Sequence, residues 1–182
     1  MNTRGDCIRV VHPLFQEESS GSIPTSPLQL EFGRCPMPVA MALNREWHSR
    51  VPELRNQTGK NVAFAAIFDG RYFAVAIWGE PIARMLNGKG MLELRRMAIA
   101  PDAPKNTGSR MLRVMRLLLR KEGLGLKRLI SYQDTDVHAG TIYKAAGWTA
   151  CNTSKPSAKG WNTRKRGEMQ TWGEKVRWEI DA

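Results

Sequence analysis

Residues 131–148 hold the densest set of side chains that could do chemistry. Tyr132, Asp134, Asp136, His138 and Tyr143 fall within thirteen positions and offer proton donors, proton acceptors and metal ligands. An apolar stretch typical of a buried strand precedes them, and the pattern of a short helix follows them. Loops between a strand and a helix often carry sites at the open edge of an α/β sheet. We therefore predict a functional site here, and the alternative is a solvated loop with a helix cap.

A second candidate site lies where a predicted loop leads into the first turn of a helix. Such a turn exposes backbone N–H groups and the positive end of the helix dipole, which together bind anions. The residues of this anion site are Lys105, Asn106, Thr107, Gly108, Ser109 and Arg110. Their spacing matches neither the P-loop nor the GxGxxG pattern, so it gives no support for ATP or NAD. The alternative is an ordinary helix start capped by Ser109 or Thr107.

Individual roles can be assigned to five of the titratable side chains. His48, at the end of a predicted helix, is suited to be a base or a metal ligand, and its alternative role is a helix C-cap. Asp134 could orient an amine, accept a proton or bind a metal, whereas Asp136 is the better cap for the next helix. We expect His138 to orient the loop, and Tyr143 to be a general acid or part of the core. Two histidines and one carboxylate suffice for non-haem iron, so His48, Asp134 and His138 are candidate iron ligands.

The elements that position these residues follow from the hydrophobic periodicity. Helices are predicted over 39–47, from about Ser109 or Arg110 to Glu122, and over 141–146; strands are predicted over 62–68, 72–78, 91–100, 126–132 and 175–180. Asp69-Gly70 indicates a tight antiparallel hairpin, and Gly123 a left-handed helix C-cap. This order predicts an α/β (α+β) protein with a mixed, mostly antiparallel central sheet flanked by helices. We expect a partly irregular N-terminal segment, 1–37, and a single domain over 38–182.

The sequence also predicts the buried side of the short helix and the two faces of the strand over 91–100. In the short helix, Ile142, Ala145, Ala146 and Trp148 are predicted to form the buried side. In the strand over 91–100, alternation places Arg96 on the face of Leu92 and Leu94, opposite Glu93 and Arg95. Because buried strands seldom carry arginine, we expect Arg95 or Arg96 to be paired or to point into a cleft.

The charge points to a polyanionic partner. The 182 residues include 28 Lys and Arg against 17 Asp and Glu, which gives a net charge of +11 and a pI near 10.1. Nucleic acid is the commonest partner of so basic a protein, and the alternatives are generic basicity or a phosphate-bearing cofactor. No apolar run is long enough to span a membrane, no apolar segment follows the N-terminus, and the three cysteines are widely spaced. These features favour a cytoplasmic protein.

Basic residues and aromatic residues alternate near the C-terminus. From Lys155 to Arg177 there are seven basic residues and two acidic ones, with Trp161 and Trp172 among them. This mixture suits phosphate contacts and base stacking. The residues expected to contact DNA or substrate are Trp47, Ser49, Tyr132, His138, Lys155, Arg164, Lys165 and Arg166. Trp47, Trp78, Trp148 and Trp161 are candidates for stacking, although core positions are more typical of Trp78 and Trp148.

The order of elements resembles the GNAT acyltransferase superfamily over roughly residues 40–150. The resemblance implies that the strand over 91–100 pairs with pantetheine and that residues 105–110 hold the pyrophosphate of acyl-CoA (acetyl-CoA). It also implies a tyrosine near the thioester, at the start of Tyr143-Lys-Ala-Ala-Gly-Trp148. The superfamily loop usually has a second small residue where this chain has Arg110.

A closer resemblance is to the Mom-like DNA-modification proteins of Mu-type phages. It rests mainly on Ser131-Tyr-Gln-Asp134 and on His138-Ala-Gly-Thr-Ile-Tyr143-Lys-Ala, with support from Trp47-His48-Ser49, Glu93-Leu-Arg-Arg96 and Ser109. The resemblance implies a phage or prophage enzyme that adds a carbamoylmethyl (acetamido) group to adenine N6 in double-stranded DNA. It implies catalytic roles for His48, Arg96, Asp134 and Tyr143. Since N6 is buried in a duplex, the adenine must flip out.

Two other functions fit the same residues. One is a conventional acetyl-CoA-dependent N-acetyltransferase that acts on a protein or a small amine. The other is a non-catalytic DNA-binding module on a GNAT fold, which would bind DNA with a steep dependence on salt.

Overall fold

The chain forms one seven-stranded sheet in the computed structural model, which describes residues 23–48, 61–154 and 173–182. The strands are β1 (Glu31–Arg34), β2 (Val62–Phe68), β3 (Arg71–Gly79), β4 (Met91–Ile99), β5 (Arg128–Asp134), β6 (Thr149–Ser154) and β7 (Lys175–Asp181). Their spatial order is β1-β2-β3-β4-β5-β7-β6. Only the β4–β5 pair is parallel among these neighbours. The predicted mixed, mostly antiparallel sheet is confirmed.

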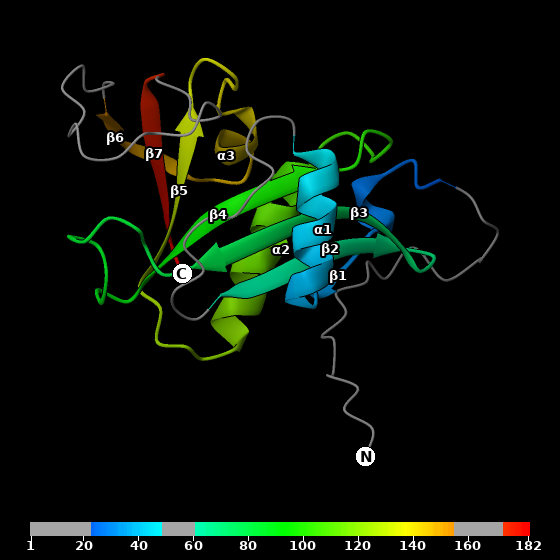
Figure 1. The fold of residues 1–182 in the computed structure, drawn as a ribbon, viewed down its shortest axis with the longest axis horizontal. Coiled ribbons are helices and arrows are strands. Elements are labelled where there is room, and N and C mark those ends of the chain that lie inside the picture. Colours follow the sequence, from blue (N-terminus) through cyan, green and yellow to red (C-terminus); the bar gives the residue numbers. More distant parts are fainter. Residues whose placement is uncertain (1–22, 49–60, 155–172) are drawn as a thin grey trace.

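Helices cover both faces of the sheet. The helix α1 (Met37–Trp47) lies across β2, β3 and β4 on one face, and α2 (Thr107–Lys121) lies behind the sheet in Figure 1. The short helix α3 (Thr141–Ala145) lies close to α2, and a 3-10 turn, η1 (Pro27–Gln29), precedes β1. None of the helices in the described ranges is long and apolar enough to span a membrane.

Two separate apolar clusters fill the space between the helices and the sheet. The larger cluster lies under α2 and includes Trp78, Met111, Met115 and Leu129. The smaller cluster lies under α1 and is made mainly of small side chains, including Ala40, Ala65 and Ala98. The small side chains let α1 lie close to the strands, and this closeness fixes where the C-terminal end of α1 meets the sheet.

Turn residues behave as their sequence predicts. Asp69 and Gly70 both have positive φ, 48° and 73°, and join β2 to β3 as a tight antiparallel hairpin. Gly123 has φ 64° directly after the C-cap of α2, so the predicted left-handed helix stop is confirmed.

The prediction for the faces of β4 is wrong because the strand carries an irregularity. Ile77 pairs with Arg96 but Trp78 pairs with Leu94, so Arg95 is an extra residue in the ladder. Directly opposed residues share a face, and Ile77 belongs to the cluster under α1. Arg96 therefore faces α1, whereas Leu94 faces α2.

Several element boundaries also differ from the prediction. The strands β1 and β6 were not predicted, β5 lies two residues later than expected, and α2 begins at Thr107. Ala145 is exposed rather than buried, while Tyr143, Ala146 and Trp148 form the buried side of α3 and its end. The buried positions of Trp78 and Trp148 confirm the expectation that these rings belong to the core.

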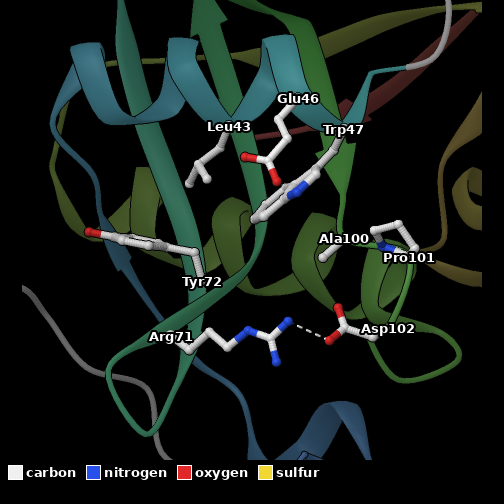
Figure 2. A pocket seen from close by; sticks show the side chains of 8 residues that line it. All are labelled: Leu43, Glu46, Trp47, Arg71, Tyr72, Ala100, Pro101 and Asp102. Carbon is white, nitrogen blue, oxygen red and sulfur yellow. Dashed lines mark hydrogen bonds and ion pairs between the residues drawn. The ribbon is translucent and has the colours of Figure 1, made fainter.

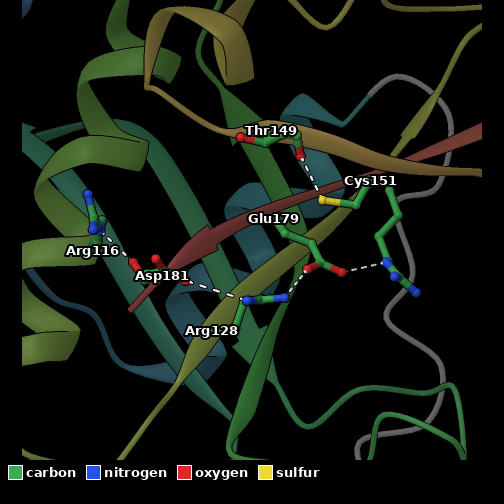
Figure 3. A network of polar contacts seen from close by, with 7 residues as sticks. Arg116, Arg128, Thr149, Cys151, Glu179 and Asp181 are labelled. Atoms are coloured by element: carbon green, nitrogen blue, oxygen red, sulfur yellow. Dashed lines mark hydrogen bonds and ion pairs between the residues drawn. The ribbon is translucent and has the colours of Figure 1, made fainter.

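An ion-pair network holds the C-terminal strand against β5 (Figure 3). The buried carboxylate of Glu179 contacts Arg128 Nη1 at 2.9 Å and Arg177 Nε at 2.7 Å. Arg116 Nε donates to the Asp181 carbonyl at 2.6 Å, which ties α2 to the same strand. Cys151 lies beside Glu179, and burial followed by the Glu179 charge raises the pKa of its thiol.

Replacing Glu179 by alanine is expected to lower the free energy of unfolding by roughly 1–3 kcal/mol. The loss should be smaller than the ~3–5 kcal/mol of a fully buried pair, because both arginines are partly exposed. Urea denaturation measures the change. The matched control is Asp181→Ala, which removes an exposed partner 3.7 Å from the same Arg128 and should cost under ~1 kcal/mol. Equal losses in the two variants would contradict this account of the network.

Candidate active site

The parallel pairing of β4 and β5 stops halfway along these strands. Four residue pairs join them, from Met91↔Arg128 to Leu94↔Ser131. Beyond Leu94, β4 continues for five residues and β5 continues for three without pairing to each other. The two strands thus part toward their carboxyl ends, which is where ligands bind in open α/β sheets.

His48 lies beside this opening on the α1 face. It is the C-cap of α1, and its backbone N–H donates to the Asn44 carbonyl at 2.9 Å. Burial lowers the pKa of its imidazole, and the positive charges of Arg96 and His138 lower it further. Both cations are therefore near enough to His48 to act on the charge of its ring. The structure therefore joins residues from α1, β4 and the loop after β5 at one place.

Arg96 faces His48 because of the β4 irregularity. Its Nη1 donates to the Arg95 carbonyl at 2.6 Å, and burial followed by the Arg95 charge lowers its pKa. Glu93 also lies near Arg96, because its negative charge raises the pKa of Arg96 and so opposes the effect of Arg95. The Glu93 carboxylate is buried, accepts the Ile82 N–H at 3.0 Å, and has a pKa raised mainly by burial.

Replacing Arg96 by glutamine is expected to raise the pKa of His48 toward its ordinary value of 6.5, because one nearby cation is removed. In the wild type the imidazole stays neutral until the pH falls through a value below 6.5. The contribution of neutral His48 to the free energy of unfolding is complete at pH values above the pKa of His48 in the unfolded chain. It is lost as the pH falls through the lower pKa of His48 in the folded protein. NMR titration of the ring would measure the change. The control is Lys89→Gln, in the loop before β4, because Lys89 is not among the groups that shift the pKa of His48. An unchanged or lower His48 pKa in Arg96→Gln would contradict the assignment.

The turn that carries His138 is held by Asp134 and Gln133. The Asp134 carboxylate accepts the Asp136 N–H at 3.1 Å, and its carbonyl accepts the N–H groups of Val137 and His138. Gln133 is buried, donates to the His138 carbonyl, and accepts the Trp178 indole N–H at 2.6 Å. Sequence reasoning missed Gln133, because its role depends on a partner 45 positions away.

Asp136 does not cap the following helix. The N-cap of α3 is Gly140, with φ 72° and no side-chain cap. A Cβ atom at position 140 would collide with the side chains of Gln133 and Trp178, so this position requires glycine. Asp136 and Asp134 instead lie against Gly173 at the start of the segment that leads into β7.

Tyr143 lies in the core on the opposite face of the sheet from His48. Its hydroxyl shares a 2.8 Å hydrogen bond with Ser131 Oγ, and its ring stacks on Trp178 with centroids 5.4 Å apart. Burial raises its pKa. Tyr132, the neighbour of Ser131, is partly exposed on the other face, and its pKa is raised mainly by burial despite a hydrogen bond from Arg177.

The alternative prediction for residues 105–110, a helix start capped by Thr107 or Ser109, is wrong. The N-cap of α2 is Asn106 in a left-handed conformation, and no side chain caps the first turn. Thr107 Oγ1 donates to the Pro104 carbonyl and Ser109 Oγ to the Asn106 carbonyl, so neither hydroxyl caps the helix. Gly108 lies against β4 and α3, where a Cβ would stand 3.0 Å from Ile99 Cδ1. Lys105 is exposed.

Arg110 adds a donor to the same place. Its Nε is buried and has no hydrogen-bond partner among the described residues. An arginine donor without a partner beside an uncapped helix start can bind an anion.

The three candidate iron ligands are not assembled into a metal site. The described ranges contain no group of three or more His, Cys, Asp or Glu side chains placed to hold a metal ion. His48 and His138 approach each other, but Asp134 directs its carboxylate to the backbone of its own turn. Ser49, Lys155, Arg164, Lys165 and Arg166 lie outside the described residues, as does Trp161.

Three solved structures that share this fold are acetyltransferases. The ribosomal-protein-S18-alanine N-acetyltransferase from Escherichia coli is 16% identical with a TM-score of 0.56, over 82% of this chain and 92% of that one. A Bacillus subtilis acetyltransferase in complex with CoA is 11% identical with a TM-score of 0.57, over 85% and 98%. The aminoglycoside acetyltransferase AAC(6')-Ib, in complex with coenzyme A and kanamycin, is 12% identical with a TM-score of 0.58, over 84% and 94%.

The fold is thus the GNAT fold of these acetyltransferases, as the order of elements predicted. No curated protein sequence matches the chain. The family model of the Mom protein family matches residues 29–180, and the chain belongs to this family.

Proposed function

We propose that this protein is a transferase that modifies adenine in DNA by adding a carbamoylmethyl group to N6. The observation that carries the proposal is the convergence of His48, Arg96 and His138 beside the opening between β4 and β5 in a member of the Mom protein family. The net charge of +11 supports a polyanionic substrate. The target adenine would leave the duplex before it reacts.

His48 would act as the base in this reaction. Its pKa is lowered by burial, Arg96 and His138, so the imidazole is neutral near pH 7 and can accept a proton. Arg96 would supply positive charge for a developing anion, and Asp134 would hold the turn that positions His138. Tyr143 is buried and bonded to Ser131, which favours a packing role over a general-acid role.

Acyl-CoA fits the site as a bound group. The uncapped first turn of α2, with Gly108 and the buried Arg110 Nε, offers donors for a pyrophosphate. Beyond Leu94, β4 no longer pairs with β5, and a pantetheine chain would lie along this edge of β4. When bound, acyl-CoA would supply an activated acyl carbon, and the CoA thiol would leave. The carbamoylmethyl group is bonded to N6 through its CH2 carbon, so the reaction requires a further donor of that carbon.

Nucleoside mass spectrometry tests the proposed function. The protein is co-expressed with a plasmid, and the plasmid DNA is digested to nucleosides. A new deoxyadenosine derivative with the mass of the carbamoylmethyl adduct supports the proposal. Unmodified deoxyadenosine from a strain that makes soluble, folded protein counts against it.

A second candidate is an acetyl-CoA-dependent N-acetyltransferase that acts on a protein or a small amine. The solved structures that bind coenzyme A favour it, together with the opening between β4 and β5. It predicts that acetyl-CoA raises the melting temperature and that thiol is released when an amine acceptor is added. If acetyl-CoA neither binds nor stabilises the protein, this candidate fails.

A further inference from the structure

A pocket of about 350 Å³ opens at the end of α1, one residue before His48. Its walls come from the last turns of α1, the start of β3 and the loop after β4 (Figure 2). This volume lies near the lower end of the range for small-molecule sites, roughly 300–1,000 Å³. Trp47 is predicted above to contact the substrate, and the other lining residues have no role in the site described so far.

Two aromatic rings form the walls of the pocket. Trp47 extends its indole from α1 toward Ala100, and Tyr72 lies on the other side in Figure 2. Both side chains pack against the apolar cluster under α1 and remain partly exposed at the pocket. Rings placed at a solvent-accessible opening can stack on a planar ligand, and every nucleobase has such a face.

The floor of the pocket presents a hydrogen-bond donor beside an acceptor. Arg71 Nη2 contacts Asp102 Oδ2 at 2.5 Å, and the guanidinium also lies 5.0 Å from the centre of the Phe73 ring. These contacts fix the arginine, which keeps further N–H groups for a ligand, while the carboxylate keeps further lone pairs. The Glu46 carboxylate adds an acceptor at the α1 side (Figure 2).

We propose that this pocket binds a nucleobase of the DNA substrate after the base has left the helical stack. The base stacks between Trp47 and Tyr72, and its polar edge meets Arg71, Asp102 or Glu46. Adenine presents an acceptor, N7, beside a donor, its N6 amino group, which complements the Arg71–Asp102 pair. Guanine presents two adjacent acceptors on the same edge and matches it less well. This inference rests on the proposed function, because DNA is the substrate there.

The position of the pocket supports a role in substrate binding. Trp47 precedes His48 directly, and Asp102 lies in the loop that leads to the start of α2. The pocket thus adjoins the proposed base on one side and the loop of the anion site on the other. A base held here lies beside the groups that the proposed reaction uses.

The contribution of the base to DNA binding tests the proposal. The probe is a single-stranded thymine oligonucleotide with one central adenine, compared with the same strand holding an abasic site. We expect the wild type to bind the adenine strand about tenfold more tightly. Trp47→Ala and Tyr72→Ala should each reduce this ratio to near one, and Trp47→Phe should restore part of it. Circular dichroism confirms that each variant is folded.

A matched control exists elsewhere on the surface. Arg34 also lies 5.0 Å from a phenylalanine ring, that of Phe64, and also contacts a carboxylate, that of Glu122, at 2.5 Å. Arg34→Ala should keep the wild-type ratio, whereas Arg71→Ala should lower the preference for adenine over guanine. If Trp47→Ala and Tyr72→Ala keep the wild-type ratio between binding of the adenine strand and of the abasic strand, the proposal is overturned.

Coenzyme A also contains an adenine ring, so a second set of binding measurements distinguishes a DNA base from the adenine of coenzyme A as the occupant of the pocket. If the pocket holds the DNA base, saturating CoA leaves the ratio unchanged, and Trp47→Ala binds CoA as well as the wild type does. Competition by CoA together with weaker CoA binding in Trp47→Ala overturns the proposal. The binding ratio requires no chemical product, so a wild type that shows the ratio but modifies no DNA refutes the proposed reaction alone.

Discussion

Alanine in place of His48 is expected to lower the yield of modified deoxyadenosine by about 100-fold or more. A positioned acid or base typically contributes ~10²–10⁴-fold to a rate. The neutral imidazole beside Arg96 and His138 is the described group best suited to accept a proton at pH 7. Quantitative mass spectrometry of plasmid nucleosides measures the loss.

The His48 variant should remain folded, because the neutral ring contributes little to the helix dipole at this position. Arg45→Ala, an exposed change in the last turn of the same helix, serves as the control and should keep the wild-type yield. If His48→Ala retains most of the modification while the wild-type assay is active, His48 is not the base.

Alanine in place of Tyr143 is expected to lower the free energy of unfolding by about 3–5 kcal/mol, the usual cost of removing a buried aromatic ring. The ring stacks on Trp178, meets Trp148 edge-on at 5.7 Å, and leaves Ser131 without its partner when removed. Urea denaturation gives the change. A loss below ~1 kcal/mol would contradict the core position.

Tyr143→Phe separates the packing role from the catalytic one. The ring stays, and only the hydroxyl that bonds Ser131 is lost, so stability should fall by about 1–3 kcal/mol. We expect the yield of modified deoxyadenosine to stay within about tenfold of the wild type. A decrease of more than about 100-fold in the folded variant would assign the general-acid role to Tyr143.

The sequence predicts the elements whose own residues determine them. The β2–β3 hairpin follows from Asp69-Gly70, and the buried side of α2 follows from the spacing of Met111, Met115 and Leu118. The strand β6 could not be predicted in this way, because its residues are all exposed and its conformation depends on pairing with β7. The short strand β1 depends in the same way on β2.

In the candidate site, too, the sequence predicts what depends on residue type and not what depends on contacts between distant parts of the chain. The residue types of His48, Arg96 and His138 mark them as candidates, but their proximity arises from the fold. In β4, the face of Arg96 depends on its register with β3, and a single extra residue reverses the alternation. Gln133 and Glu179 act through partners distant in the chain, so no local pattern identifies them.

The most direct test of the central claim is the mass of the deoxyadenosine in DNA from cells that make this protein. We expect a carbamoylmethyl derivative of deoxyadenosine in plasmid DNA co-expressed with the wild type, and its loss with His48→Ala. If cells that contain soluble and folded wild-type protein yield DNA with no modified deoxyadenosine, the claim is contradicted.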